Sequence, residues 1–156
     1  MKGNPNVLTS LRQLLKYELT AINQSFLHAR MCLDWGYEGI AHAIRKASIR
    51  NMVFAEQLVD RILFLEGMPN LRDTYHLRIG TDVGQIHARD RKLARDTANC
   101  ANAGIDVCVK HEDDASRELL ESILADEELR IDWLESQLQI ISDAGLGLYL
   151  SQQMRR

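Results

Sequence analysis

The segment from Ile40 to Gly67, IAHAIRKASIRNMVFAEQLVDRILFLEG, decides the fold that this chain is expected to take. Mostly apolar residues recur in it at steps of three and four, the spacing of one face of an α-helix. The members of this stripe are Ile40, Ile44, Ala47, Asn51, Phe54, Leu58 and Leu65. The segment is therefore predicted to form one long helix whose stripe faces the core of a helical bundle.

A second apolar stripe lies about a quarter turn away on the same predicted helix. It consists of Ile49, Met52, Val59 and Leu63. A helix in a four-helix bundle needs only one buried face, so the second stripe offers more apolar surface than the bundle uses. This second face is predicted to meet another subunit, with Met52 in its middle.

Three further long helices and one short helix are expected along the chain. Asn4 and Pro5 begin the first helix, because asparagine is a good N-cap and proline is tolerated in the first helical turn. Acidic residues 112–114 supply a cap for the fourth helix. Taken in order, the five expected helices cover about residues 5–35, 40–67, 82–111, 115–142 and 146–154.

Residues 68–81, MPNLRDTYHLRIGT, show no helical stripe and are predicted to cross the whole bundle. About 14 extended residues reach ~45 Å, which matches the ~42 Å length of a 28-residue helix. The third helix would then run parallel to the second. The predicted fold is an all-α four-helix bundle with one long crossover loop and a short C-terminal fifth helix, as a single domain over 1–156.

Composition narrows the possible functions. The net charge is -3, the pI is near 5.9, and the 19 basic residues are scattered, which argues against nucleic-acid binding. No apolar run approaches the ~20 residues of a membrane span, and the amino terminus lacks a signal-peptide pattern. Cys32, Cys100 and Cys108 have no C-x-x-C spacing and are expected to stay reduced, so we expect a cytoplasmic location.

Several separate segments of the sequence resemble bacterioferritin, the haem-containing branch of the ferritin superfamily. They are MKGNPNV, LLKYELTAINQSFLHARM, DWG, RILFLEGMPNL, LRIGTDV and DEELRIDWLESQL, and they occur in the family's order and spacing. The resemblance covers essentially the whole chain. It implies a ferritin-like fold and a hollow shell of twenty-four subunits built from two-fold dimers. It also implies haem b between paired subunits and an iron mineral core inside the shell.

The family's di-iron ferroxidase centre takes a carboxylate from each of two helices and a Glu-x-x-His pair from each of the other two. By resemblance, the six positions in this chain are Glu18, Asn51, Phe54, Ala94, Glu127 and Arg130, and Ser25 stands where the family usually has a tyrosine. Two ferrous ions bring four positive charges, which two carboxylates beside a guanidinium cannot balance. The di-iron centre is therefore expected to be absent, with Glu18 and Glu127 as remnants that do not function.

Two outcomes are open for the remnant site. In the first, Arg130 pairs with Glu18 or Glu127 and Phe54 fills the vacated volume, so that a buried ion pair replaces the metal. In the second, Glu18 and Glu127 hold a single residual metal ion, although two oxygen-donor side chains are a poor ligand set.

Other iron-related positions of the family are changed or weakly informative. Lys46 and Arg50 occupy the helix face that carries an inner-surface iron site in some relatives, and their charge would repel ferrous ions. The matches to acidic positions near a subunit pore are Asp34, Glu66 and Asp132. The five histidines form no pair at a spacing of three or four and are not expected to rebuild a metal site, and His28 is assigned to the dimer face of the family.

Met52 matches the methionine that ligates haem in the family, where two subunits each donate one thioether to the same iron. Leu19, Ile22, Asn23 and Phe26 of the first helix are expected to line the same face as a haem pocket. Arg45 departs from the aromatic residue that relatives often carry. A lone methionine at helical spacing is commonly a packing residue, so the resemblance carries this assignment.

The sequence therefore favours a haem-binding, ferroxidase-deficient bacterioferritin subunit for iron storage. By this reading it co-assembles with a ferroxidase-active subunit and returns electrons for iron release, with bacterioferritin-associated ferredoxin as the donor. The alternatives are a ferroxidase with an atypical iron site, a haem-free structural shell subunit, and a haem store or electron-transfer protein that assembles only with itself.

Overall fold

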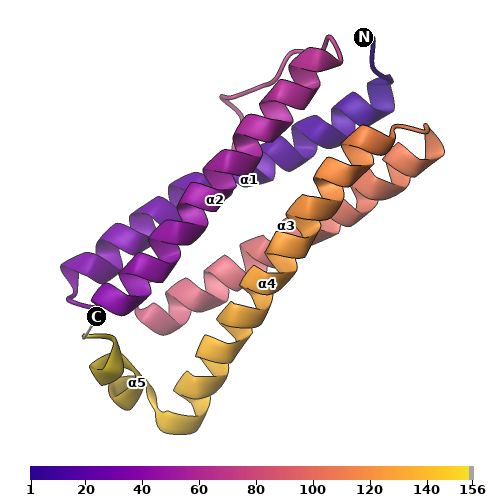
Figure 1. Cartoon of the computed structure of the whole chain (residues 1–156). Coiled ribbons are helices and arrows are strands. Elements are labelled where there is room, and N and C mark those ends of the chain that lie inside the picture. The colour runs from indigo at the N-terminus through magenta and orange to yellow at the C-terminus, as the bar shows by residue number, and fades with distance from the viewer. Residues whose placement is uncertain (155–156) are drawn as a thin grey trace.

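The computed structural model describes residues 1–154 of the chain. This part contains five α-helices and no strand. The helices are α1 (Pro5–Asp34), α2 (Glu38–Phe64), α3 (Val83–Lys110), α4 (Asp114–Ala144) and α5 (Leu146–Gln153). The four long helices lie side by side as a bundle, and α5 lies across one end of it (Figure 1). The predicted all-α bundle with a short fifth helix is confirmed.

Side-chain caps fix the beginnings of three long helices. The Asn4 side chain accepts a hydrogen bond from the Asn6 N–H at 2.8 Å, and Asp82 does the same for Gln85 at 2.8 Å. Asp113 accepts from the Ser116 N–H at 3.0 Å. Each cap satisfies a backbone N–H group that has no partner within its own helix.

The second helix ends three residues before the predicted limit at Gly67. Glu66 adopts a left-handed conformation with φ 61°, and the Gly67 N–H donates to the Ile62 carbonyl at 2.9 Å. This arrangement satisfies a free carbonyl at the helix end and turns the chain away from the helix axis. Apolar periodicity alone did not show this turn, because Leu65 still packs in the core.

The connection between α2 and α3 runs the length of the bundle. In Figure 1, α3 begins at the end of the bundle where α2 begins, so the two helices are parallel, as predicted. Three side chains spaced one turn apart on α1 accept hydrogen bonds from crossover N–H groups. These bonds run from Tyr75 N to Thr20 Oγ1 at 2.9 Å, from Arg78 N to Gln24 Oε1 at 3.0 Å and from Gly80 N to His28 Nε2 at 3.1 Å.

We call these three contacts the crossover ladder. Gly80 at its end also packs closely against the first turn of α3, because a Cβ atom there would lie 2.5 Å from the Ile86 nitrogen. Only glycine fits so close to another backbone segment. The ladder and this contact fix the crossover against α1 on one side and α3 on the other.

The bundle core has two apolar clusters. One contains Val7, Leu8, Leu11, Leu14 and Leu15 of α1 with parts of the other long helices. The other includes Ala29, Cys32, Ile40, Ile44 and Tyr149. Polar residues of α1 between the clusters are buried as well: Glu18, Thr20, Gln24, Ser25 and His28. A polar layer therefore separates the two apolar regions at mid-height of the bundle.

Helix α5 is attached through one buried tyrosine. Tyr149 is 3 % exposed, and its hydroxyl donates to Gln137 Oε1 at 2.7 Å and lies 3.0 Å from His87 Nε2. Because the single hydroxyl proton is used on Gln137, the His87 Nε2–H must donate to the tyrosine oxygen. Burial lowers the pKa of His87 to about 4, so this imidazole is neutral.

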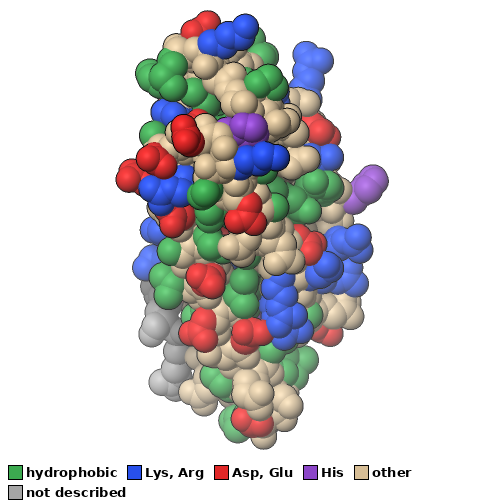
Figure 2. Space-filling model, turned by 90° about the vertical axis from the view of Figure 1, so that its right-hand side faces the viewer, with side chains coloured by type: hydrophobic (Ala, Val, Ile, Leu, Met, Phe, Trp, Pro, Cys, Tyr) green, Lys and Arg blue, Asp and Glu red, His purple; other side chains and the backbone are tan. Residues whose placement is uncertain are grey.

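Charges of both signs are interspersed over much of the face shown in Figure 2. Within residues 1–154, no helix is long and apolar enough to cross a bilayer. All three cysteines are free in the structure; Cys32 and Cys108 are buried and Cys100 is half-buried.

Candidate functional site

Three of the six positions compared with a di-iron centre meet in the polar layer. Glu18 of α1 and Glu127 of α4 are 0 % and 4 % exposed, and Asn51 of α2 is also buried. The Asn51 Nδ2 group donates to Glu18 Oε1 at 2.7 Å, whereas Glu18 Oε2 has no hydrogen-bond partner. The Asn51 amide is thus a hydrogen-bond donor to a buried carboxyl group whose other oxygen has no partner.

Both glutamates favour their protonated forms. Burial raises the pKa of Glu18 well above its usual value, and the nearby Glu127 charge raises it further. Burial raises the pKa of Glu127 to about 8, although the Arg130 charge opposes this shift. A metal ion would need these groups deprotonated, so binding would have to displace protons that the two carboxyl groups hold at neutral pH.

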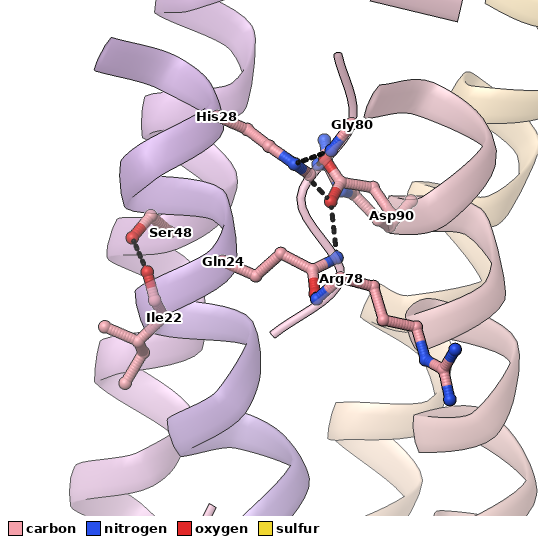
Figure 3. Close-up of polar contacts among 8 residues, drawn as sticks. Ile22, Gln24, His28, Ser48, Arg78, Gly80 and Asp90 are labelled. Atoms are coloured by element: carbon pink, nitrogen blue, oxygen red, sulfur yellow. Dashed lines mark hydrogen bonds and ion pairs between the residues drawn. The ribbon is translucent and has the colours of Figure 1, made fainter. Parts of the chain in front are cut away.

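Arg130 does not pair with either glutamate, contrary to the sequence-based hypothesis. Its Nη2 atom lies 3.6 Å from Asp90 Oδ2 of α3, and this is its ion pair within residues 1–154. The other Asp90 oxygen accepts from His28 Nδ1 at 2.8 Å and from Gln24 Nε2 at 2.9 Å (Figure 3). Asp90 therefore offers Arg130 an ionised carboxylate, whereas burial favours the protonated, neutral forms of Glu18 and Glu127.

Asp90 is the centre of this polar layer. Burial alone would raise the pKa of Asp90, but the His28 hydrogen bond and the Arg130 charge outweigh burial and lower it. Because His28 donates its Nδ1–H to Asp90, the His28 Nε2 atom carries no proton and can accept from the Gly80 N–H. In the same way, the Gln24 amide gives its N–H to Asp90 and turns its oxygen to Arg78. One carboxylate thus orients two of the three acceptors of the crossover ladder.

His28 does not lie at a dimer face, contrary to the prediction from the sequence. It was assigned to the dimer face, yet its side chain is 0 % exposed inside the bundle. A signal was present in the sequence, because Thr20, Gln24 and His28 form a polar row at a spacing of four on a helix with two apolar faces. Such a row inside a bundle indicates polar partners, here the backbone of the crossover and Asp90.

Phe54 is buried as expected, but it does not fill the space left by the missing ligands. A cavity of about 250 Å³ remains, lined by residues that include Asn51, Ala94, Glu127 and Arg130. Phe54 belongs instead to the neighbouring apolar cluster with Leu11 and Leu58. A phenylalanine ring placed in the cavity would have brought apolar surface against charged groups, so packing with the apolar cluster is favoured.

The remaining positions linked to iron lie apart from Glu18. Lys46 and Arg50 line the cavity, and Arg50 Nε donates to Asp126 at 2.6 Å. Asp34 and Asp132 are exposed, and Glu66 pairs with the N-terminal amine at 2.9 Å. Within the described residues, no three or more His, Cys, Asp or Glu side chains form a group that could hold a metal ion.

The second apolar face of the sequence analysis is present on α1 and α2. Met52 is 55 % exposed, and it shares this face with Phe26, Ile49 and Val53, which are about half-exposed as well. Leu19 and Ile22 are half-buried, whereas Asn23 and Arg45 are exposed. An apolar surface around a soft thioether donor has the chemistry that haem binding needs, so the residues fit the group.

Comparison with known proteins defines the class to which this fold and site belong. Residues 8–144 match the family model described as a ferritin-like domain. Bacterioferritin of Mycobacterium bovis is 42 % identical over 156 residues, which is 100 % of this chain and 98 % of the relative. Bacterioferritin of Streptomyces coelicolor is 42 % identical over 97 % of this chain and 90 % of the relative, and that of Brucella melitensis is 41 % identical over 96 % and 92 %.

These matches place the structure among the ferritin-like helical bundles. Within that class, the chain belongs to the bacterioferritin family. Family membership supports iron storage as its function and a multi-subunit shell as its assembly. The resemblance seen in the sequence segments is thereby confirmed.

The raised pKa values predict how stability changes with pH. A carboxyl group with a higher pKa in the folded than in the unfolded state stabilises the fold below its unfolded pKa, and this contribution is lost as pH rises through its folded pKa. For Glu127 the window runs from about 4.5 to about 8. The free energy of unfolding, and with it the melting temperature, should therefore fall across this range. Glu127→Gln should reduce the fall in the free energy of unfolding by an amount on the order of a few kcal/mol.

Thermal unfolding at constant ionic strength and protein concentration from pH 5 to pH 8.5 measures this effect. The exposed neighbour Glu128 provides the control, because Glu128→Gln removes a carboxylate from the same turn without touching the polar layer. Equal slopes for the wild type and Glu127→Gln would show that folding does not raise the pKa of Glu127.

Proposed function

We propose that this chain is a haem-binding, ferroxidase-deficient bacterioferritin subunit that stores iron in a mixed shell of twenty-four subunits. The observation that carries the proposal is the contrast between the apolar surface around Met52 and the remnant of the di-iron site. Met52 lies in an uncovered apolar surface, whereas Asn51, Phe54, Ala94 and Arg130 occupy four ligand positions with side chains that bring neither a carboxylate nor an imidazole. By this proposal, a ferroxidase-active subunit oxidises iron, and this chain returns electrons through its haem for iron release.

The role of each residue at the haem face follows from its position. Met52 would ligate the haem iron, together with Met52 of a second copy. Leu19, Ile22 and Phe26 would cover the ring and exclude water, and Asn23 would lie at the polar edge. Haem supplies one-electron transfer when it is bound. Apolar surroundings favour this role because they limit solvent access to the iron.

The remnant site does not fit a di-iron centre. Glu18 and Glu127 favour protonation, and Arg130 adds positive charge beside them. Binding two ferrous ions would bury positive charge that these groups do not balance. We therefore infer that the chain has no ferroxidase activity of its own. The electron donor would be bacterioferritin-associated ferredoxin, and the shell would be cytoplasmic.

One observation favours a second candidate, a residual single-metal site. Glu18 Oε2 is buried without a hydrogen-bond partner, and a cation could supply one. The ligand set is nevertheless small, because Glu18 and Glu127 would be joined only by the Asn51 oxygen, while the Asn51 nitrogen now donates to Glu18. Iron oxidation by the isolated protein separates this candidate from the first.

Haem content tests the main proposal. Met52→Leu keeps the apolar volume but removes the sulfur donor, so the protein should assemble and lose its Soret absorbance almost completely. Met68→Leu is a matched control, because Met68 is 73 % exposed on the crossover, away from the apolar face. The haem-to-protein ratio is measured after expression with excess haem precursor. Full haem occupancy in Met52→Leu, or a colourless wild type, would reject the proposed ligand.

A further inference from the structure

A second, chemically different pocket lies between α1, the crossover and α3. Its volume is about 180 Å³, and its lining includes Tyr75 and Arg78 of the crossover with Arg89, Lys92 and Asp96 of α3. This is below the ~300 Å³ at which pockets for drug-sized ligands begin, so the pocket can enclose a small group, while the rest of a larger ligand would lie outside it. The pocket is separate from the remnant metal site and from the apolar face of Met52.

The charge of this pocket is positive although the whole chain is acidic. Its lining has three basic residues, Arg78, Arg89 and Lys92, and one acidic residue, Asp96. Lys92 already forms an ion pair within the chain, because its Nζ atom lies 2.8 Å from Asp96 Oδ1. Arg78 and Arg89 form no ion pair with any residue of 1–154. Two free guanidinium groups thus face a shared hollow.

The crossover ladder holds the backbone of Arg78 in place at the edge of this pocket. The Arg78 backbone N–H is bound to Gln24, and Gln24 is fixed by Asp90 (Figure 3). The Tyr75 N–H is bound to Thr20, and the Tyr75 ring is covered by Tyr17 at 4.5 Å between centroids and by Lys16 Nζ at 4.0 Å. The wall is therefore rigid, and because the ring faces are already covered, recognition there depends on charge rather than stacking.

We propose that this pocket binds a phosphate group, held between the guanidinium groups of Arg78 and Arg89. Guanidinium groups present planar pairs of N–H donors that match the oxygens of phosphate, and charge-assisted bonds of this kind are stronger than neutral ones. A rigid wall lowers the entropy cost of binding. The same chemistry serves free inorganic phosphate and the phosphate of a nucleotide. The proposal does not depend on the haem or ferroxidase assignments.

Titration calorimetry on the assembled full-length protein, after reductive removal of iron, tests this site. Inorganic phosphate and adenosine monophosphate are titrated separately in chloride buffer of constant ionic strength. We expect saturable binding that becomes at least about tenfold weaker in the Arg78→Gln/Arg89→Gln double variant. Arg91→Gln is the control, because Arg91 lies on α3 but does not line the pocket.

The two ligands distinguish the source of the phosphate group. Similar affinity for both identifies a site for the free anion, and tighter binding of the nucleotide identifies a site for a larger phosphorylated molecule; either result supports the proposal. Both arginines are exposed and unpaired, so the double variant should fold, and the two single variants provide a further check. Absence of saturable binding by either ligand, or undiminished binding by the double variant, would overturn the proposal.

Discussion

Shells assembled from this chain alone are expected to oxidise ferrous iron in air no faster than protein-free buffer. The reason is the composition of the polar layer, where Glu18 and Glu127 favour protonation and Arg130 adds a positive charge close to Glu127. The measurement is the absorbance of the ferric product after ferrous addition, on protein checked for assembly. A rate clearly above buffer would favour the residual single-metal candidate.

Restoring the ligands provides the converse experiment. The quadruple variant Asn51→Glu, Phe54→His, Ala94→Glu and Arg130→His should oxidise iron faster than the wild type. We expect a gain on the order of 10–100-fold, the scale on which metal sites respond to changes in the groups that support them. Ala94→Glu alone is the control and should stay at the buffer rate. A silent quadruple variant, if assembled, would show that the bundle geometry around the site has also changed.

Asp90→Ala is expected to destabilise the fold by about 3–5 kcal/mol, because it leaves the buried Arg130 charge without its ion pair. It also removes the acceptor of His28 and Gln24, which hold the crossover. For a chain of this size the melting temperature should fall by roughly 10 °C. Thermal unfolding at fixed protein concentration, with the assembly state checked, measures the effect.

Two further variants separate the charge from the crossover ladder. Arg130→Leu removes the ion pair but keeps the ladder, so it should lower the free energy of unfolding by a few kcal/mol less than Asp90→Ala does. If the leucine packs well, the free energy of unfolding should stay close to that of the wild type. Asp96→Ala, on the surface of the same helix, is the control. Hydrogen exchange at the Arg78 and Gly80 amides should become faster in Asp90→Ala only. Unchanged melting and exchange in Asp90→Ala would contradict a central role for this carboxylate.

The helices were predictable because their signals are local. Caps such as Asn4 and Asp82, and apolar residues at helical spacing, act within a few residues of one another. The crossover was predictable for a different reason, since chain length and helix length allow only one way to join α2 to a parallel α3. The positions of Glu18 and Glu127 in the core followed from the same periodicity.

Partners of buried polar groups were harder to predict. Glu18, Glu127 and Asp90 all lie on core-facing stripes, so periodicity gave no reason to prefer one of them as the partner of Arg130. The choice depends on which carboxyl group is already stabilised in its ionised form, and Asp90 receives that support from His28 and Gln24. The path of the crossover determines the roles of those two residues, and residues 68–81 show no periodic pattern of their own. The polar row of Thr20, Gln24 and His28 on α1 is the one periodic trace of that path in the sequence.

The crossover ladder also limits which length changes this connection can accept. Tyr75, Arg78 and Gly80 must each meet one acceptor on a rigid helix, and those acceptors lie four residues apart. An insertion or deletion between residues 75 and 80 would shift every later N–H group past its acceptor. Residues 69–74 come before the first ladder bond, so added residues there would leave the register intact. A tag, a label or a binding peptide can therefore be inserted in the first half of the crossover, and the second half must keep its length.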